Sequence, residues 1–445
     1  MRILLSSANF CDDPIAVYPI GMSVIAAVLI NAGHEVKQFD PMMYGPNKYQ
    51  EVAKQIIDDF APDLIGVSMR NLDNVDSRAD NANFFDSIMG VVRLWGTLSS
   101  APIMLGGPGF SMYPERILEL SGASYGIVGE GENAVLEIVE AIASGNPLPN
   151  GAILRRQSNK IFGATYAQDI ADFYNQETHI IPVQTKRGCP FNCVYCTYPM
   201  LEGHVMRVRE LEETLRDIEY IKLNYPDAMV YFSDSVFNDP TRHFEKLVRE
   251  MIRRDLAVPW TGFITPAQVR DGDIEMLAES GMALVDLGVD AATDATLVGM
   301  GKNFTFAEVV SCCATLRKLN VGITASVMFG GPGETWATVD EGIANLRALE
   351  PAYSIVFPGI RVFDGAPLIE IARNEALLPA DWNGTEPLYY FAPGIEPEIL
   401  HEKLLAGFAG SKYCVYPPSS RNDDLRMINK FGYPKLRKLQ LGGAS

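Results

Sequence analysis

Three cysteines lie within eight positions of one another in this chain, in the run Arg187-Gly-Cys189-Pro-Phe-Asn-Cys193-Val-Tyr-Cys196. Thiolates spaced four and three residues apart on one loop can converge on a single metal centre. Iron–sulfur clusters take cysteine thiolates as ligands, and three ligands leave one iron of a cubane free to bind something else. The spacing therefore favours a 4Fe-4S cluster on Cys189, Cys193 and Cys196.

Two other kinds of site use cysteines at similar spacings. A structural zinc site needs a fourth ligand, for which the nearest candidate is His204, eight residues after Cys196. A redox Cys-x-x-Cys pair accounts for Cys193 and Cys196 but leaves Cys189 unexplained. The cluster uses all three cysteines and is the interpretation that we prefer. The other cysteines are scattered and are expected to be packing residues: Cys11, Cys312, Cys313 and Cys414.

The elements around this loop alternate between strand and helix from His179 onward. Candidate strands are 181–185, 229–232, 260–264, 284–288, 323–329 and 354–360. Candidate helices are 211–223, 242–254, 273–280, 306–319 and 336–349. Six such units predict a closed or partial barrel, whose chemistry sits at the carboxyl ends of the strands.

The cysteine motif, with Tyr195 before its last cysteine and a strand in front of it, resembles the radical SAM superfamily. The resemblance covers roughly residues 179–372. It implies a 4Fe-4S cluster that binds S-adenosylmethionine (SAM) through the open iron and cleaves it reductively to a 5′-deoxyadenosyl radical. It also implies an external electron donor such as flavodoxin.

The resemblance further implies SAM contacts at three strand ends. Asp234, in Tyr-Phe-Ser-Asp, stands where the family places a polar patch for the SAM amino group, and Asp290 stands where a ribose contact is expected. Gly330 and Gly331 stand where the backbone approaches the adenine. Taken alone, either carboxylate would be interpreted as a helix cap or a loop residue, and the SAM assignment depends on their order after the cysteine motif. The run Met300-Gly-Lys-Asn precedes a helix and receives no role.

The first third of the chain also alternates between strands and helices. Candidate strands are 3–5, 36–39, 64–68, 103–105 and 125–128, and candidate helices are 21–32, 49–60, 84–97 and 132–143. This spacing predicts a parallel sheet covered on both faces, with ligands at the carboxyl ends of its strands.

This region resembles a cobalamin-binding Rossmann-like domain placed ahead of a radical SAM barrel. The residues that the resemblance assigns to cobalamin follow the strands: Ser68, Arg70, Asn71, Gly106, Gly107, Gly129 and Glu130. The alternative explanation of the glycines is tight turns between strands and helices. No Asp-x-His-x-x-Gly motif is present among the five histidines, so we expect cobalamin without a histidine lower ligand. Arg70 then either reaches the lower corrin face or stands exposed in an Asx-type turn.

Over nearly its whole length the chain resembles the cobalamin-binding radical SAM subgroup named for lipid biosynthesis. We expect it to methylate an unactivated carbon of a small-molecule or lipid-like substrate, through methylcobalamin and the 5′-deoxyadenosyl radical. The alternative is a rearrangement, cyclisation or hydration with the same cofactors and no methyl transfer. A non-catalytic sensor would not need the open iron, and a methylthiotransferase would need three further cysteines in the first domain, where only Cys11 occurs.

The composition limits the remaining possibilities. The 445 residues include 37 Lys and Arg against 55 Asp and Glu, a formal net charge of −18 that argues against nucleic acid. No apolar run reaches the roughly 18 residues of a membrane span, so we expect a cytoplasmic α/β protein without a transmembrane segment. The expected parts are a cobalamin domain (1–145), a linker with a small hairpin (146–177), a partial (β/α)6 barrel (178–373) and a mostly helical capping region (374–445).

Overall fold

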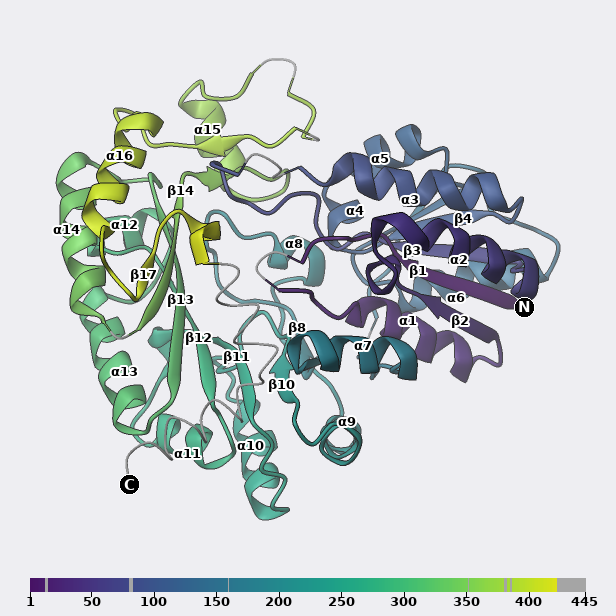
Figure 1. Cartoon of the computed structure of the whole chain (residues 1–445), viewed down its shortest axis with the longest axis horizontal. Coiled ribbons are helices and arrows are strands. Elements are labelled where there is room, and N and C mark those ends of the chain that lie inside the picture. Colours follow the sequence, from purple (N-terminus) through teal and green to yellow (C-terminus); the bar gives the residue numbers. More distant parts are fainter. Residues whose placement is uncertain are drawn as a thin grey trace. The chain divides into compact units, whose positions relative to one another are not determined.

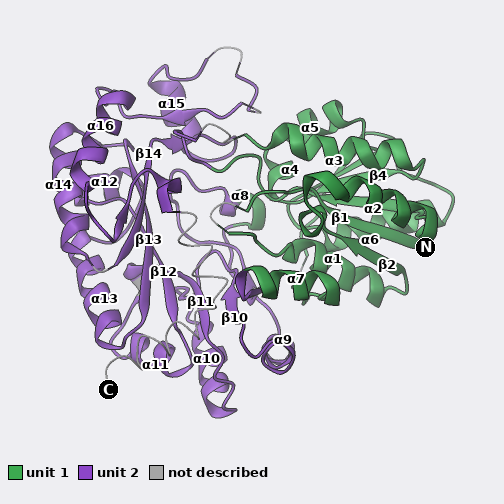
Figure 2. Cartoon of the chain, in the orientation of Figure 1, with its two compact units in different colours: residues 1–74, 83–177, 200–203 green, residues 75–82, 178–199, 204–445 purple. Residues whose placement is uncertain are grey.

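The computed structural model describes residues 1–12, 15–79, 83–158, 160–350, 352–379, 382–384 and 386–421. The chain divides into two compact units (Figures 1 and 2). The first unit comprises residues 1–74, 83–177 and 200–203, and the second comprises residues 75–82, 178–199 and everything from 204 onward.

The first unit is built on a six-stranded parallel sheet with the strand order β2-β1-β3-β4-β5-β6. Its strands are β1 (Arg2–Ser7), β2 (Glu35–Phe39), β3 (Leu64–Ser68), β4 (Ile103–Gly106), β5 (Tyr125–Val128) and β6 (Ala152–Arg155). The central strands are continuous apolar runs because both faces of the sheet are covered. The Rossmann-like α/β fold expected for this region is confirmed.

The helices of the first unit cover this sheet, against which they pack their apolar faces. They are α1 (Ile20–Asn31), α2 (Gly45–Phe60), α3 (Phe85–Leu98), α4 (Pro108–Met112), α5 (Pro114–Ser121), α6 (Glu132–Ala143) and α7 (Gln168–Thr178), with a 3-10 turn at Pro41–Met43. Helix α2 buries one stripe, which includes Ala53 and Ile56, whereas α1 is apolar on all sides and largely buried.

The hairpin expected between residues 146 and 177 is wrong. Ala152–Arg155 instead pairs in parallel with β5, in the register Tyr125 to Ala152 and Val128 to Arg155. Helix α6 accounts for the difference, because a helical crossover returns the chain to run parallel to the strand that precedes it.

The second unit contains a seven-stranded parallel sheet with the order β17-β14-β13-β12-β11-β10-β7. Its strands are β7 (Ile180–Val183), β10 (Met229–Phe232), β11 (Trp260–Ile264), β12 (Leu284–Asp290), β13 (Gly322–Phe329), β14 (Tyr353–Pro358) and β17 (Cys414–Val415). Strands β7 and β17 form its two edges, so the described barrel is partial. The seventh strand was not expected, because two residues carry no periodicity that a sequence could show.

Helices cover the outer face of this sheet (Figure 1). They are α9 (Leu211–Asn224), α10 (Phe244–Arg253), α11 (Asp273–Glu279), α12 (Asp294–Gly299), α13 (Phe306–Lys318) and α14 (Trp336–Ala348). Capping boxes at Thr293, Thr305 and Thr335 start α12, α13 and α14, so these helices begin immediately after the loops that carry the site.

The remaining elements of the second unit are short. They are β8 (Lys186–Arg187) paired with β9 (Arg207–Val208), β15 (Ile360–Arg361) paired with β16 (Tyr389–Tyr390), α8 (Tyr198–Glu202), α15 (Leu368–Asn374), α16 (Pro397–Phe408) and 3-10 turns at Pro266–Gln268 and Pro418–Arg421. Part of the expected capping region, residues 422–445, lies outside the described residues. None of the helices in the described ranges is long and apolar enough to cross a membrane.

Candidate cofactor-binding and active sites

The three motif cysteines lie on the loop that follows β7 and β8. Cys189 is buried, and Cys193 and Cys196 are partly buried. The pKa of Cys196 is raised to about 12, chiefly by burial and to a smaller extent by the nearby Cys193 and Cys189. Burial and Cys193 also raise the pKa of Cys189. Cys189 and Cys196, whose thiolate forms are disfavoured in this way, need a strongly cationic centre to become ligands, and iron would supply one.

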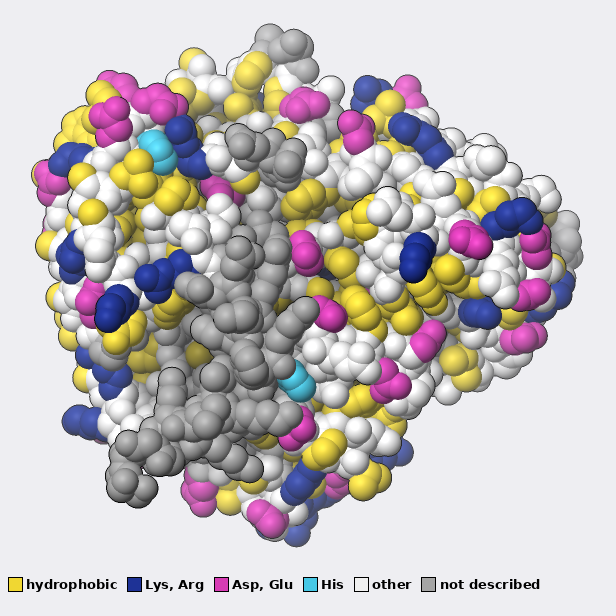
Figure 3. All heavy atoms as spheres, in the orientation of Figure 1, with side chains coloured by type: hydrophobic (Ala, Val, Ile, Leu, Met, Phe, Trp, Pro, Cys, Tyr) yellow, Lys and Arg dark blue, Asp and Glu magenta, His cyan; other side chains and the backbone are white. Residues whose placement is uncertain are grey.

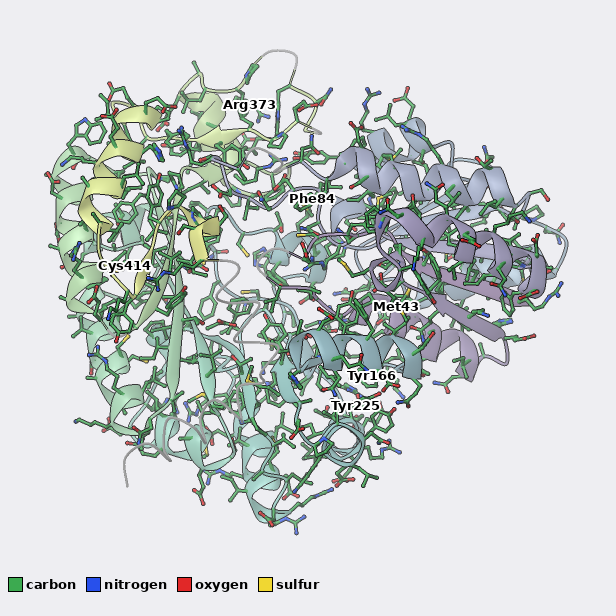
Figure 4. All side chains as sticks on the ribbon, viewed as in Figure 1. Met43, Phe84, Tyr166, Tyr225, Arg373 and Cys414 are labelled. Atoms are coloured by element: carbon green, nitrogen blue, oxygen red, sulfur yellow. The ribbon has the colours of Figure 1, made fainter. Side chains whose placement is uncertain are left out.

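No three His, Cys, Asp or Glu side chains of the described residues come together closely enough to hold a single metal ion. A cubane binds each thiolate at a different corner, so its ligands lie further apart than those of a single zinc ion. Three thiols on one loop match the three protein ligands of such a cluster. Cys414 lies on β17, at the sheet edge opposite β7 (Figure 4).

The Met300–Lys302 turn packs directly against the cysteine loop. The amide of Val194 donates to the carbonyl of Met300 at 3.1 Å. Gly301 has a φ of +74°, and a Cβ there would lie 2.6 Å from the carbonyl oxygen of Asn192. Only glycine fits this left-handed position at such a close approach. The run that received no role in the sequence therefore supports the cysteine loop.

Lys302 projects from this turn into the cysteine loop. Its Nζ lies 3.0 Å from the Tyr195 hydroxyl, is ion-paired with Asp290, and is hydrogen-bonded to Cys193. Burial lowers the pKa of Lys302, but Asp290 and Cys193 outweigh burial, and the net shift is upward. Asp290 itself is held in the left-handed region, with a φ of 61°. A positive charge is thus fixed beside one of the three thiols.

A third loop, which follows β13, packs against the Met300–Lys302 turn. Gly330 has a φ of +88°, and a Cβ on Gly331 would lie 2.9 Å from the sulfur of Met300. A Cβ on Gly299 would lie 1.8 Å from the carbonyl oxygen of Pro332. The close approaches that these glycines permit are therefore between loops of the protein, with the Met300–Lys302 turn held between the cysteine loop and the Gly330–Pro332 loop.

Asp234 is fully buried at the end of β10. One carboxylate oxygen accepts from the amides of Thr185 at 2.7 Å and Lys186 at 3.1 Å, and the other pairs with the Lys186 ammonium at 3.1 Å. These contacts fix the segment that leads into the cysteine loop. The next residue, Ser235, donates from its hydroxyl to the carbonyl of Gly188 at 2.7 Å.

In the first unit, the loops after β1 and β3 are tied together at the carboxyl edge of the sheet. The side-chain amide of Asn9 donates to the side-chain oxygen of Asn71 at 2.7 Å, and the amide of Arg70 donates to the side-chain oxygen of Asn9 at 2.8 Å. Ser68 ends β3, and its carbonyl accepts from Ala8 at 3.1 Å. The three predicted residues Ser68, Arg70 and Asn71 therefore lie on one fixed edge.

The loops after β4 and β5 join this edge through Ser111. Its hydroxyl donates to the carbonyl of Gly107 at 2.9 Å and accepts from the amide of Gly129 at 3.0 Å. A Cβ on Gly107 would lie 2.5 Å from the carbonyl oxygen of Met69. Packing within the sheet edge thus requires Gly107. Gly106 ends β4 beside it, and Glu130 accepts from the amide of Ser158 at 2.8 Å.

Asp40 and Tyr174 form a buried polar pair that sequence reasoning missed. The Tyr174 hydroxyl donates to Asp40 at 2.8 Å. Burial raises the pKa of Asp40 to about 6, against the opposing effects of Tyr174, the Met42 amide, Arg70 and Ser7. The only sequence signal was the position of Asp40 directly after a strand. The buried carboxyl of Asp40 therefore lies close to Arg70 at the carboxyl edge of the first sheet.

The first unit contains one histidine, His34. It lies between α1 and β2, and its Nδ1 lies 3.5 Å from the amino group of Met1, where β1 begins. In a parallel sheet this is the edge formed by the amino ends of the strands, opposite the edge formed by their carboxyl ends, where ligands bind. The one histidine of this unit therefore lies away from the loops at the carboxyl ends of its strands.

Family models match two parts of the chain. A B12 binding domain covers residues 15–139, and the radical SAM superfamily domain covers residues 183–344. The chain is 23% identical to an uncharacterized methyltransferase of Pyrococcus horikoshii, over 82% of this chain and 80% of the relative. It is 22% identical to tryptophan 2-C-methyltransferase of Streptomyces laurentii, over 84% of this chain and 74% of the relative.

A solved structure has the same fold. The radical S-adenosylmethionine methyltransferase TsrM from Kitasatospora setae superposes with a TM-score of 0.84 over 100% of both chains, at 22% identity. The two domain matches and the two folds described above agree in order and position. The chain therefore carries a B12 binding domain followed by a radical SAM domain.

Proposed function

We propose that this protein is a cobalamin-dependent radical SAM enzyme that methylates an unactivated carbon of a small-molecule substrate. The observation that carries the proposal is the cysteine loop, fixed by two further loops at the carboxyl ends of barrel strands, in a chain that also has a B12 binding domain. Methyltransferases among its relatives support the choice of reaction, since tryptophan 2-C-methyltransferase is similar to this chain over most of its length.

Cys189, Cys193 and Cys196 would hold the 4Fe-4S cluster. The cluster supplies the electron that cleaves SAM, and cobalamin supplies the methyl group. Lys302 would keep a positive charge beside Cys193 and, through Tyr195, fix the loop on which the ligands lie. Rigid placement of the reacting groups is the main contribution that the protein makes in such enzymes.

SAM would lie over the strand ends that carry Asp290, Gly330 and Gly331. Asp290 would offer its carboxylate to the ribose while remaining paired with Lys302. The contacts of Asp234 support a different role from the one expected, because its carboxylate already receives Thr185 and Lys186. We assign Asp234 to positioning the cysteine loop, and Ser235 then stands nearest to the place where an amino group would bind.

Cobalamin would lie over the carboxyl edge of the first sheet, against the loops that carry Ser68 to Asn71, Gly106, Gly107, Gly129 and Glu130. Arg70 would face its lower side in place of a histidine. The absence of histidine from this edge supports the assignment. An external one-electron donor of the flavodoxin kind would reduce the cluster.

Product analysis tests the reaction. Anaerobically reconstituted enzyme should bind about four irons, and incubation with methyl-labelled SAM, a reductant and cell extract should yield S-adenosylhomocysteine, 5′-deoxyadenosine and a labelled product. Formation of 5′-deoxyadenosine without S-adenosylhomocysteine would favour the rearrangement, cyclisation or hydration instead. Replacing all three motif cysteines by alanine should remove the iron, whereas Cys414→Ala should retain it; a full cluster in the triple variant would refute the assignment.

A further inference from the structure

One row of side chains crosses the second sheet from strand to strand. Phe263 on β11 is in register with Asp286 on β12, Asp286 with Thr324 on β13, and Thr324 with Tyr353 on β14. Side chains in register on parallel strands point to the same face of a sheet. These four side chains therefore form one continuous row.

The row lies on the face of the sheet that the helices leave uncovered. Along β12, Asp286 is only partly buried, whereas its neighbours Val285 and Leu287 are buried on the opposite face. On β13, Phe329 shares the face of those neighbours, and a Cβ on Gly342 of α14 would lie 2.9 Å from its ring. The helices thus cover the other face (Figure 1), and the row points inward.

Asp286 carries a charge that no cation of the described residues balances. The Thr324 hydroxyl donates to its carboxylate, and this is the one hydrogen bond that the carboxylate makes within the described part of the chain. Burial raises the pKa of Asp286, and Thr324 opposes the rise. A carboxylate withdrawn from water without a cationic partner is costly unless a bound molecule supplies that partner.

Aromatic side chains share the face of the sheet with this carboxylate. Phe263 is 39% exposed although it lies within a strand, and its ring meets that of Tyr231 edge-on at 6.2 Å between centroids. Burial raises the pKa of Tyr231, and both Asp286 and Tyr198 raise it further. Tyr231 is in register with Thr261, two residues before Phe263 on β11, so the Tyr231 and Phe263 side chains lie on the same face of the sheet as Asp286.

We propose that this row binds the substrate and that the substrate is a small molecule with a planar aromatic ring and a protonated amine. The amine would pair with Asp286, and the ring would pack against Phe263, Tyr231 and Tyr353. A cation beside aromatic faces gains from their quadrupoles as well as from the carboxylate. The inference rests on the proposed function, because it names the substrate class of the same barrel.

Calorimetric titration of the reconstituted holoenzyme tests the inference without requiring turnover. The probes are benzylamine, tyramine and tryptamine, each compared with the carboxylate of the same ring: phenylacetate, 3-(4-hydroxyphenyl)propanoate and 3-indolepropanoate. At least one amine should bind ten times more tightly than its carboxylate. Asp286→Asn should weaken that amine at least tenfold and leave S-adenosylhomocysteine binding unchanged.

Asp340→Asn is the matched control, because Asp340 is exposed and pairs with Lys403 on the surface. It should bind the amine as the wild type does. Failure of all three amines to bind, equal binding of amine and carboxylate, or unchanged amine binding by Asp286→Asn would overturn the inference. The iron and cobalamin contents of the same samples distinguish a failure of the proposed function from a failure of the proposed substrate class. Protein that contains both iron and cobalamin yet binds no amine refutes only the substrate class.

Discussion

The ammonium of Lys302 lies 3.0 Å from the hydroxyl of Tyr195, and the two residues are 107 positions apart in the chain. The contact joins the turn before α13 to the cysteine loop, and the same ammonium is hydrogen-bonded to Cys193. A fixed positive charge at this distance stabilises additional negative charge on whatever the thiolate binds. We therefore expect Lys302 to act on the cluster as well as on the loop.

Lys302→Met should make the cluster harder to reduce. Removing one charge beside a thiolate ligand should shift the midpoint potential to more negative values by on the order of 100 mV. Potentiometric titration followed by electron paramagnetic resonance measures the shift. Lys302→Arg should restore most of it, and Lys403→Met, which removes a surface lysine paired with Asp340, should leave the potential unchanged.

Gly301→Ala should impair cluster assembly. The new Cβ would meet the Asn192 carbonyl at 2.6 Å and push the cysteine loop out of place. Gly272→Ala is the control for backbone strain, because Gly272 has a similar φ of +83° but nothing within 4 Å of a Cβ. Both variants lose about 1 kcal/mol to the left-handed conformation, and Gly301→Ala alone should lose iron after reconstitution. Equal iron in the two variants would contradict the nested arrangement of loops.

Cobalamin bound to this protein should lack nitrogen ligation from histidine. The electron paramagnetic resonance spectrum of its cob(II)alamin form should be the same whether or not the protein's histidines are labelled with 15N, since the one histidine of the first unit lies at the opposite edge of the sheet. Arg70→Ala should change this spectrum, whereas Arg93→Ala, on the exposed side of α3, should not. Gly107 is unsuitable for this test, because any side chain there collides with Met69.

Asp40 should make stability fall as the pH rises from about 4 to about 6. Its folded pKa of about 6 lies above the ordinary value of 3.8, so the folded state binds the proton more tightly. The stabilisation is complete below pH 4, is lost through this window, and amounts to about 3 kcal/mol. Asp40→Asn should remove that slope from melting temperatures measured against pH. Asp58→Asn, which changes an exposed carboxylate paired with Lys54, should keep it.

Apolar runs of four or five residues could be predicted as strands from the sequence, as Met229–Phe232 and Trp260–Ile264 show. Short strands could not, because β17 has two residues and its pairing with Ser354 and Ile355 depends on tertiary contacts. The direction of β6 was also hidden, since a strand's residues do not state whether its partner runs parallel or antiparallel.

The cysteines could be identified because their types and spacing already suffice for a ligand set. Lys302 could not be assigned, since its role depends on contacts with Tyr195 and Cys193 that only the folded chain creates. Gly107 and Gly331 were expected to approach a cofactor, and the structure shows that each makes room for a neighbouring loop. A glycine in a sequence indicates that another group approaches the backbone closely, but the sequence does not show whether that group is a cofactor or another loop of the protein.

The division of the chain into units has a consequence for protein engineering. The chain passes from one unit to the other after residues 74, 82, 177, 199 and 203. Residues 75–82 belong to the second unit, where Arg78 pairs with Glu398 at 2.7 Å and the Ser77 hydroxyl donates to the Pro358 carbonyl at 2.5 Å. In a chimaera joined only at residue 177, residues 75–82 would come from a different protein than the barrel they pack on, and residues 200–203 from a different protein than the first sheet. A graft between such proteins must therefore also be joined at the four other crossings, after residues 74, 82, 199 and 203.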